Sequence, residues 1–185
     1  MKVRGFEVVS KYANGEADER IIIPDSPARV NESKIFFDEN ENKDFRMPFR
    51  ASSGAAGYDI VNNTGAEIVI NPGETVKITT YLKSYMQADE VLTLFPRSSH
   101  GFKYLVRLAN SVGIIDADYF DNENNEGEIF LKLTNPERSG KQLVIPHGEA
   151  MCQGIFSKVL RTDDDCLTHG PVRVGGIGST TKKVK

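Results

Sequence analysis

The chain has 185 residues, which is enough for one domain with a hydrophobic core and short for two. Its 26 acidic residues outnumber the 23 basic ones, so it has no surplus of cations for coating nucleic acid. Two cysteines and three scattered histidines form neither a disulfide framework nor a zinc-type spacing, and no stretch has the length and apolarity of a signal peptide or membrane span. These features predict a cytoplasmic protein.

Short strand-like segments follow one another along the chain. Residues 1–9 predict a first strand, whereas residues 10–50 mix apolar clusters with an acidic run and predict an insertion with one or two short strands and a solvated loop. From residue 51, turn residues separate the predicted strands, which are 58–61, 67–70, 75–86, 90–95, 105–115, 128–133, 142–145 and 151–160. No segment carries a sustained helical period, so the pattern predicts an all-β fold, a barrel or a double-sheet jelly roll.

The last part of the chain differs from the rest in composition. Residues 169–185 contain a glycine-rich run followed by lysines and offer no core-forming side chains. Such a segment is mobile unless something holds it in place. The sequence therefore predicts one β-barrel domain over residues 1–168 and a flexible C-terminal arm over residues 169–185.

In one segment, a carboxylate follows directly after an apolar run. Residues 112–115 are apolar and are followed directly by Asp116, Asp118 and Tyr119. The run predicts a buried strand that ends at a turn, where a carboxylate can be held in a fixed and partly dry position, as a general base needs. Taken alone, the segment favours a simpler interpretation, in which the two aspartates are ordinary turn residues.

Five short clusters carry side chains or glycines suited to a phosphorylated ligand, although each alone also fits an ordinary turn. Arg97, Ser98 and Ser99, for example, offer a guanidinium and two hydroxyls to phosphate oxygens just after a predicted strand. The glycine cluster lacks the spacing of a Walker-type phosphate loop. In chain order the clusters read AGYD (56–59), PRSS (96–99), NSVGIIDADY (110–119), GEAMCQGIF (148–156) and RVGGIGST (173–180).

In this order and spacing, the five clusters resemble the motifs of the trimeric dUTP pyrophosphatase (dUTPase) family, in the branch found in Gram-positive bacteria and their phages. The resemblance implies a distorted jelly roll and a dUTP diphosphatase that forms dUMP and pyrophosphate. This activity keeps uracil out of DNA and supplies dUMP for thymidylate synthesis. The resemblance also implies Mg²⁺ as cofactor and a homotrimer whose active sites combine motifs of more than one subunit, without direct contact with nucleic acid or membrane.

The resemblance also assigns roles to residues. Asp116 matches the general base for attack of water on the α-phosphorus, Tyr119 the aromatic that packs on the deoxyribose, and Asp59 a carboxylate that reaches the metal through water. The β-hairpin that recognises uracil corresponds to Asn110, Gly113 and Ile115. The phosphate contacts correspond to Arg97, Ser98, Ser99 and Gln153, and the arm that folds over the substrate corresponds to Arg173, Ile177, Gly178, Ser179 and Thr180.

Three features depart from the usual family pattern. Ala150 stands where many members carry an arginine, and Ile177 stands where most carry an aromatic that stacks on uracil. Base–aromatic stacking contributes roughly 1–3 kcal/mol per base, so the isoleucine predicts weaker substrate binding. The third departure is the insertion at residues 120–127, for which we expect a surface loop rather than a lining of a neighbouring active site.

Two alternative functions stay open at this stage. A dCTP deaminase has the same fold and an Arg-Ser-Ser cluster, although Asp-Ala-Asp-Tyr after the apolar run favours the pyrophosphatase. A phage dUTPase-like regulatory protein would bind a repressor, with residues 32–44 or 120–127 as the contact surface. Substrate turnover distinguishes the first alternative, and nucleotide binding without turnover would indicate the second.

Overall fold

We analysed a computed structural model that describes residues 2–13, 22–24 and 45–165. Its first strands are β1 (Gly5–Val8), β2 (Ile22–Pro24), β3 (Tyr58–Val61), β4 (Ile68–Ile70), β5 (Thr75–Thr79) and β6 (Leu82–Tyr85). The later strands are β7 (Glu90–Pro96), β8 (Arg107–Leu108), β9 (Gly113–Asp116), β10 (Phe130–Thr134), β11 (Leu143–Ile145) and β12 (Ala150–Lys158). The helical segments are short and comprise α1 (Ser10–Ala13), α2 (Ser98–Tyr104) and the 3₁₀ turns η2 (Ala117–Tyr119) and η3 (Glu137–Ser139).

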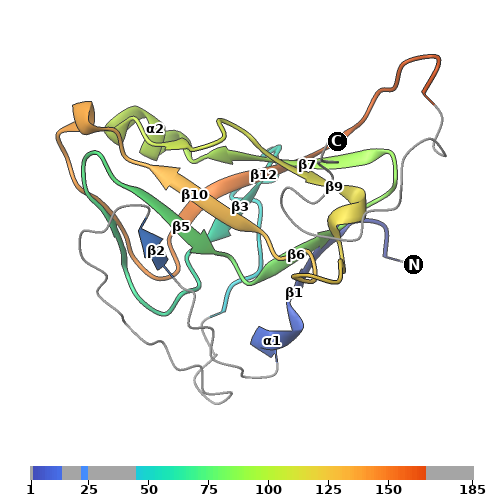
Figure 1. Cartoon of the computed structure of the whole chain (residues 1–185), viewed down its shortest axis with the longest axis horizontal. Helices are drawn as coiled ribbons and strands as arrows, with labels where there is room; N and C mark the ends of the chain where they lie inside the picture. The colour runs from blue at the N-terminus through green and yellow to red at the C-terminus, as the bar shows by residue number, and fades with distance from the viewer. Residues whose placement is uncertain (1, 14–21, 25–44, 166–185) are drawn as a thin grey trace, which may run out of the picture.

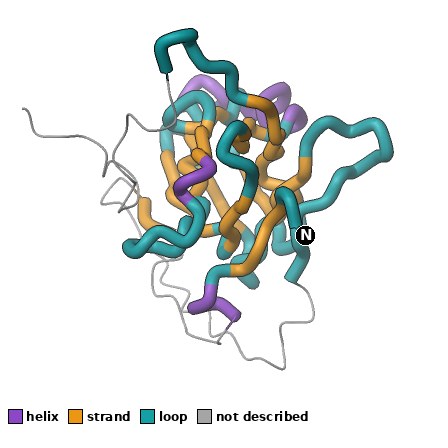
Figure 2. Tube along the Cα trace, turned by 90° about the vertical axis from the view of Figure 1, so that its right-hand side faces the viewer, coloured by secondary structure: helices purple, strands orange, loops and turns teal. Residues whose placement is uncertain are grey.

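The described strands pair antiparallel in four sheets. Two four-stranded sheets have the orders β2-β5-β10-β8 and β3-β12-β7-β9, and two smaller sheets pair β1 with β6 and β11 with β4. Figure 1 shows β5 and β10 in one layer and β12, β7 and β9 in the other. The strands lie at the centre of the molecule, and loops and short helices surround them (Figure 2). This all-β architecture confirms the predicted jelly roll.

The hydrophobic core lies between the sheets because alternate side chains of each strand point to opposite faces. On β7, Leu92 and Leu94 are buried, whereas Val91 and Thr93 are only half-buried. The core draws apolar residues from both large sheets and from the β4–β11 pair, among them Ile60, Ile70, Ile78, Leu131, Leu133 and Met151. Burying such side chains stabilises the fold by roughly 1.5–3 kcal/mol for each large residue.

Two of the predicted strands are each divided in two by a residue with positive φ. Tyr81, with φ of 59°, separates β5 from β6, so that the first pairs with β10 and the second with β1. Ser111, with φ of 66°, separates β8 from β9, which lie in different four-stranded sheets. Neither residue is of the type that usually marks such a turn, since positive φ favours glycine and asparagine. The sequence pattern therefore predicted each pair as one long strand.

The N-terminal insertion is described only in part. β1 confirms the predicted first strand, and β2 falls on the first of the two apolar clusters in residues 10–50. The second cluster and the acidic run of this insertion lie outside the described residues, as do Cys166 and the whole predicted arm at 169–185. In the described part of the chain, no helix is long and apolar enough to cross a membrane.

Candidate functional site

Three adjacent strands bring residues of the first, second and fourth motifs into one row. In the register of the sheet, Gln153 on β12 lies opposite Asp59 on β3 and opposite Phe95 on β7. Arg97 follows the end of β7 and begins α2. The antiparallel register therefore places the predicted phosphate-binding residues and the predicted metal-side carboxylate at one end of this sheet.

Gly57 leaves the space that the side chain of Gln153 occupies at this end of the sheet. A Cβ atom at position 57 would lie 2.3 Å from Cγ and 2.6 Å from Cδ of Gln153, closer than real Cβ atoms approach such atoms. Gly57 is buried, and Gln153 is half-buried above it. The glycine of the first motif is thus required for space, a role that the sequence analysis did not assign.

Arg97 is joined to Glu149 of the fourth motif. Its Nη1 donates to Oε1 of Glu149 over 3.3 Å, and Nε2 of His100 lies 3.7 Å from the same oxygen. Burial lowers the pKa of His100, while the negative charge of Glu149 opposes this shift. The Arg97 and Glu149 side chains are 38% and 39% exposed, so their ion pair is worth little and Arg97 can turn to an anionic ligand at small cost.

Ser98 and Ser99 form the first turn of α2, where the sequence analysis placed phosphate donors. Ser98 is exposed and Ser99 is half-buried. Leu105, the residue directly after the helix, caps it in a left-handed conformation with φ of 57°. Seven residues are too few to show a helical period, so the sequence did not reveal this helix.

The segment predicted to recognise uracil is a tight turn that joins β8 to β9 and is closed by an isolated bridge between Leu108 and Ser111, while the two strands pair with β10 and β7. The N–H of Ser111 donates to the carbonyl of Leu108 over 2.9 Å, and the N–H of Val112 donates to the carbonyl of Asn110 over 2.8 Å. Asn110 lies exposed at the tip. A Cβ atom on Gly113 would lie 2.9 Å from Cβ of Leu94, so glycine allows β9 to approach β7 this closely.

The prediction that the strand before Asp116 is buried is wrong. β9 is the last strand in the order of its sheet, and only alternate residues face the core. Gly113 is buried and Ile115 packs against the core, whereas Ile114 is 55% exposed and Asp116 is exposed. An apolar run alone does not distinguish an interior strand from an edge strand whose outer face is also apolar.

Asp116 does not lie beside the predicted phosphate contacts of the same chain. It pairs with Val91 at one end of β7, whereas Arg97 follows Pro96 at the other end. At about 3.3 Å per residue, Val91 and Pro96 are separated by roughly 17 Å along the strand. Within one chain, the predicted base and the predicted phosphate donors therefore lie at opposite ends of β7.

Tyr119 lies in η2, directly after Asp116, and is only 6% exposed. Its hydroxyl donates to the carbonyl of Glu128 over 2.9 Å and accepts a hydrogen bond from Nδ2 of Asn125 over 2.8 Å. The insertion that follows is exposed at Asp121, Glu123 and Asn124, as a surface loop predicts. Asn122, Asn125 and Gly127 of the same insertion contact Tyr119, which the sequence did not reveal because asparagine-rich segments are usually solvated.

At this end of the sheet, the described residues offer a single buried carboxylate for a metal rather than a preformed cage. Asp59 is 8% exposed, and no group of three His, Cys, Asp or Glu side chains in the described part of the chain could hold an ion. Mg²⁺ suits this arrangement because it keeps several waters and takes phosphate oxygens as ligands. Asp59 also raises the pKa of the buried Cys152 thiol, in addition to the larger effect of burial, so this cysteine is unreactive.

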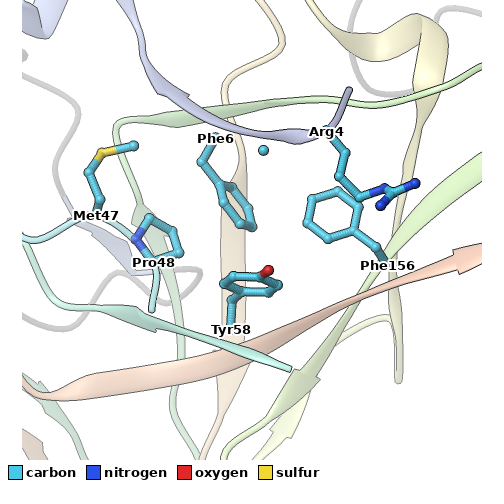
Figure 3. Close-up of a pocket in the computed structure, with 7 residues that line it drawn as sticks. Arg4, Phe6, Met47, Pro48, Tyr58 and Phe156 are labelled. Atoms are coloured by element: carbon cyan, nitrogen blue, oxygen red, sulfur yellow. The ribbon is translucent and has the colours of Figure 1, made fainter. Parts of the chain in front are cut away.

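A cavity of about 260 Å³ lies away from these residues. It is lined by Arg4, Gly5, Phe6, Met47, Pro48, Tyr58 and Phe156. In Figure 3 the rings of Phe6 and Phe156 lie over Tyr58, and the ring centroids of Phe6 and Phe156 are 5.4 Å apart. Because the lining is mainly apolar and contains none of the predicted site residues, this cavity is not the candidate active site.

Comparison with known proteins assigns the chain to a family. A family model described as dUTPase matches residues 43–181. The deoxyuridine 5'-triphosphate nucleotidohydrolase of Lactococcus lactis is 38% identical over 180 residues, which cover 97% of this chain and 99% of the relative. A second relative of that name, from Psychrobacter cryohalolentis, is 34% identical over 130 residues, covering 70% of this chain and 79% of its own.

Solved structures show the same fold. The crystal structure of dUTPase from Streptococcus mutans matches with a TM-score of 0.59 and 36% identity, covering 86% of this chain and 98% of its own. The dUTPase of Staphylococcus aureus phage phi11, described as coordinating a structural Mg(II) ion, matches with a TM-score of 0.52. At 19% identity over 68% of this chain and 92% of the phage chain, that match concerns the fold alone.

Proposed function

The chain belongs to the dUTPase family, and we propose that it hydrolyses dUTP to dUMP and pyrophosphate with Asp116 as the general base. The observation that carries this proposal is the relative from Lactococcus lactis, which aligns over almost the whole length of both chains. Asp116 takes a proton from water as the water attacks the α-phosphorus. A positioned base of this kind contributes roughly 10²–10⁴-fold to the rate.

The phosphate chain of the substrate binds at the other end of β7. Arg97 leaves Glu149 and joins Ser98 and Ser99 as donors to phosphate oxygens, and Gln153 adds its amide. When bound, Mg²⁺ neutralises phosphate charge and stabilises the pyrophosphate leaving group. Asp59 would hold that ion through a bound water, because a single carboxylate beside a triphosphate suits a metal that keeps part of its hydration shell.

The turn between β8 and β9, the start of β9 and the Tyr119 ring recognise the nucleoside. Asn110 lies in the turn and Gly113 and Ile115 lie on β9, and backbone groups of this segment pair with the uracil edge and leave unpaired donors against cytosine. Tyr119 packs on the deoxyribose and leaves no room for a 2′-hydroxyl. The fifth motif, which closes over the base and the γ-phosphate, comprises Arg173, Ile177, Gly178, Ser179 and Thr180 and lies outside the described residues.

The active form is a homotrimer in which each active site combines residues of different subunits. The separation along β7 supports this arrangement, because the base and the phosphate donors of one chain lie too far apart for one α-phosphate. Residues 1–168 form the domain, residues 169–185 form an arm that reaches a neighbouring site, and the trimer works in the cytoplasm, where it limits uracil in DNA.

Turnover of four nucleotides tests the proposal. The purified protein and its Asp116→Asn variant are incubated with Mg²⁺ and, separately, dUTP, dCTP, dTTP and UTP. We expect that only dUTP is consumed and that the variant loses activity by roughly 10²–10⁴-fold, since it cannot accept the proton. Glu123→Gln, which neutralises an exposed carboxylate nearby, serves as the matched control and retains full activity.

The same experiment distinguishes the alternatives. Conversion of dCTP to dUTP would assign the chain to the deaminases, and the assignment of Asp116 would fail with it. Binding of dUTP without turnover would favour a regulatory protein that uses the nucleotide to control a partner such as a repressor. Full activity of Asp116→Asn would overturn the assignment of the base while leaving the reaction unchanged.

A further inference from the structure

The insertion after η2 forms a set of hydrogen bonds around the hydroxyl of Tyr119. This hydroxyl accepts a bond of 2.8 Å from Nδ2 of Asn125 and donates a bond of 2.9 Å to the carbonyl of Glu128. The Tyr119 ring is 6% exposed, and Glu128 is 4% exposed. The ring is therefore held at its far end by residues that belong to the insertion and to the segment directly after it.

The amide of Asn125 has only one orientation that satisfies its neighbours. Its Oδ1 accepts bonds from Nδ2 of Asn122 over 2.7 Å and from the N–H of Gly127 over 3.3 Å. Two donors on this oxygen direct the Nδ2 group toward the Tyr119 hydroxyl. The hydroxyl proton in turn points to the carbonyl of Glu128, so the direction of each hydrogen bond is determined.

Asn122 orients Asn125 and also holds the backbone of Tyr119. It is 7% exposed, and its Nδ2 donates to the carbonyl of Tyr119 over 2.8 Å. Its Oδ1 accepts bonds from the N–H groups of Asn124 and Asn125 over 3.1 and 3.2 Å. Asn122 and Asn125 thus bind Tyr119 at two buried points, its backbone carbonyl and its hydroxyl, and fix both its backbone and its ring.

The loop is closed by Gly127 and is joined to the rest of the domain by ion pairs with Lys83. Gly127 has φ of 80°, and a Cβ atom there would lie 2.6 Å from the Tyr119 carbonyl oxygen, so only glycine closes the loop. Lys83 of β6 pairs with Asp121 and lies 3.7 Å from Oε2 of Glu126. The network around Tyr119 is thus supported by β6 rather than free to move with a surface loop.

From this geometry we propose that Asn125, oriented by Asn122, is a positioning residue that sets the ring of Tyr119 and thereby the preference for deoxyribose over ribose. The proposal rests on the proposed function, in which the Tyr119 ring sterically excludes a ribose 2′-hydroxyl. A ring held at its hydroxyl cannot tilt away from the sugar, whereas a released ring can move by the small distance that a hydroxyl group needs. The insertion then contributes to the selectivity of the active site for deoxyribose over ribose.

Asn125→Leu tests the proposal with little change in side-chain size, because it removes both the donor to Tyr119 and any oxygen that could accept the Tyr119 hydroxyl proton, whereas a carboxylate at this position would bind that hydroxyl and hold the ring. We expect the ratio of kcat/KM for dUTP to kcat/KM for UTP to fall roughly three- to tenfold, the effect of one hydrogen bond. KM for dUTP should rise, while kcat for dUTP stays within about twofold because the base is unchanged. Asn125→Ala should have the same effect on the ratio.

Two further variants separate positioning from a general loss of structure. Asn124→Ala changes an exposed side chain of the same loop and should leave the ratio unchanged. In a Tyr119→Phe background, which lacks the hydroxyl, Asn125→Leu should have no additional effect on the ratio. Loss of folded structure would instead lower turnover of dUTP and UTP by the same factor.

The outcomes for the two proposals are distinct. Wild-type protein that fails to hydrolyse dUTP would overturn the proposed function and this inference with it. Wild-type protein that hydrolyses dUTP, together with Asn125→Leu and Asn125→Ala variants that keep the wild-type ratio, would overturn the positioning role alone. A changed ratio that persists in the Tyr119→Phe background would also contradict it, because the effect would then not pass through the hydroxyl.

Discussion

Replacing Gly57 by alanine should weaken catalysis through Gln153, a residue on another strand. The new Cβ atom would lie 2.3 Å from Cγ of Gln153, so the Gln153 side chain has to leave its position. Filling a tightly packed site costs about 1–3 kcal/mol of stability. Catalysis is affected separately. In the proposed function Gln153 contacts a phosphate, and losing a hydrogen bond to a charged group weakens transition-state binding by about 1.5–3 kcal/mol, which lowers kcat/KM roughly 10- to 150-fold.

Gly54→Ala provides a matched control in the same run of small residues. A Cβ atom at position 54 would meet no heavy atom within 4 Å, and Gly54 is exposed. Steady-state kinetics with dUTP and thermal unfolding of both variants compare the two positions directly. We expect Gly54→Ala to behave as the wild type and Gly57→Ala to lose both activity and melting temperature.

A double-mutant cycle shows whether Gly57 acts through Gln153. In a Gln153→Ala background the long side chain is absent, so Gly57→Ala should cause little further loss of activity. Equal kcat/KM and equal melting temperatures for Gly57→Ala and Gly54→Ala would refute the reasoning, as would a loss of activity that is the same in both backgrounds.

Three other expectations follow from single sites. Ile177→Phe should lower KM for dUTP, since stacking on a base contributes roughly 1–3 kcal/mol, and an unchanged KM would refute the stacking account. Hydrogen bonds from the Arg4 guanidinium and, to a smaller extent, from the Gln87 N–H and Lys158 lower the pKa of Glu90 to about 2, below its ordinary value of 4.5, so this contribution to stability is present above pH 4.5 and is lost as the pH falls toward 2. Thermal unfolding across that interval should depend less on pH in Arg4→Ala, and equal slopes would contradict the assignment. Gly127→Ala should destabilise the fold by about 1–3 kcal/mol in denaturant titrations, because it combines positive φ with a clash at the Tyr119 carbonyl, and a wild-type midpoint would exclude that strain.

The sequence by itself predicted those features that depend on short stretches of chain. Alternating apolar residues and the Asn71-Pro72-Gly73 turn predicted strands on either side, and the structure places β4 and β5 there. The five motifs predicted the family because each motif is contiguous and their order does not depend on folding. The dUTPase family assignment confirmed this prediction.

Only the tertiary structure decided which of these stretches meet. The register of β3, β12 and β7 brings Asp59 beside Gln153 and leaves Asp116 at the far end of β7, and no local pattern encodes such a register. The contact of Asn125 with Tyr119 likewise depends on how the loop closes at Gly127. Local sequence determines which backbone conformations are favourable, whereas the pairing of distant segments is set by how all their side chains pack together into one core.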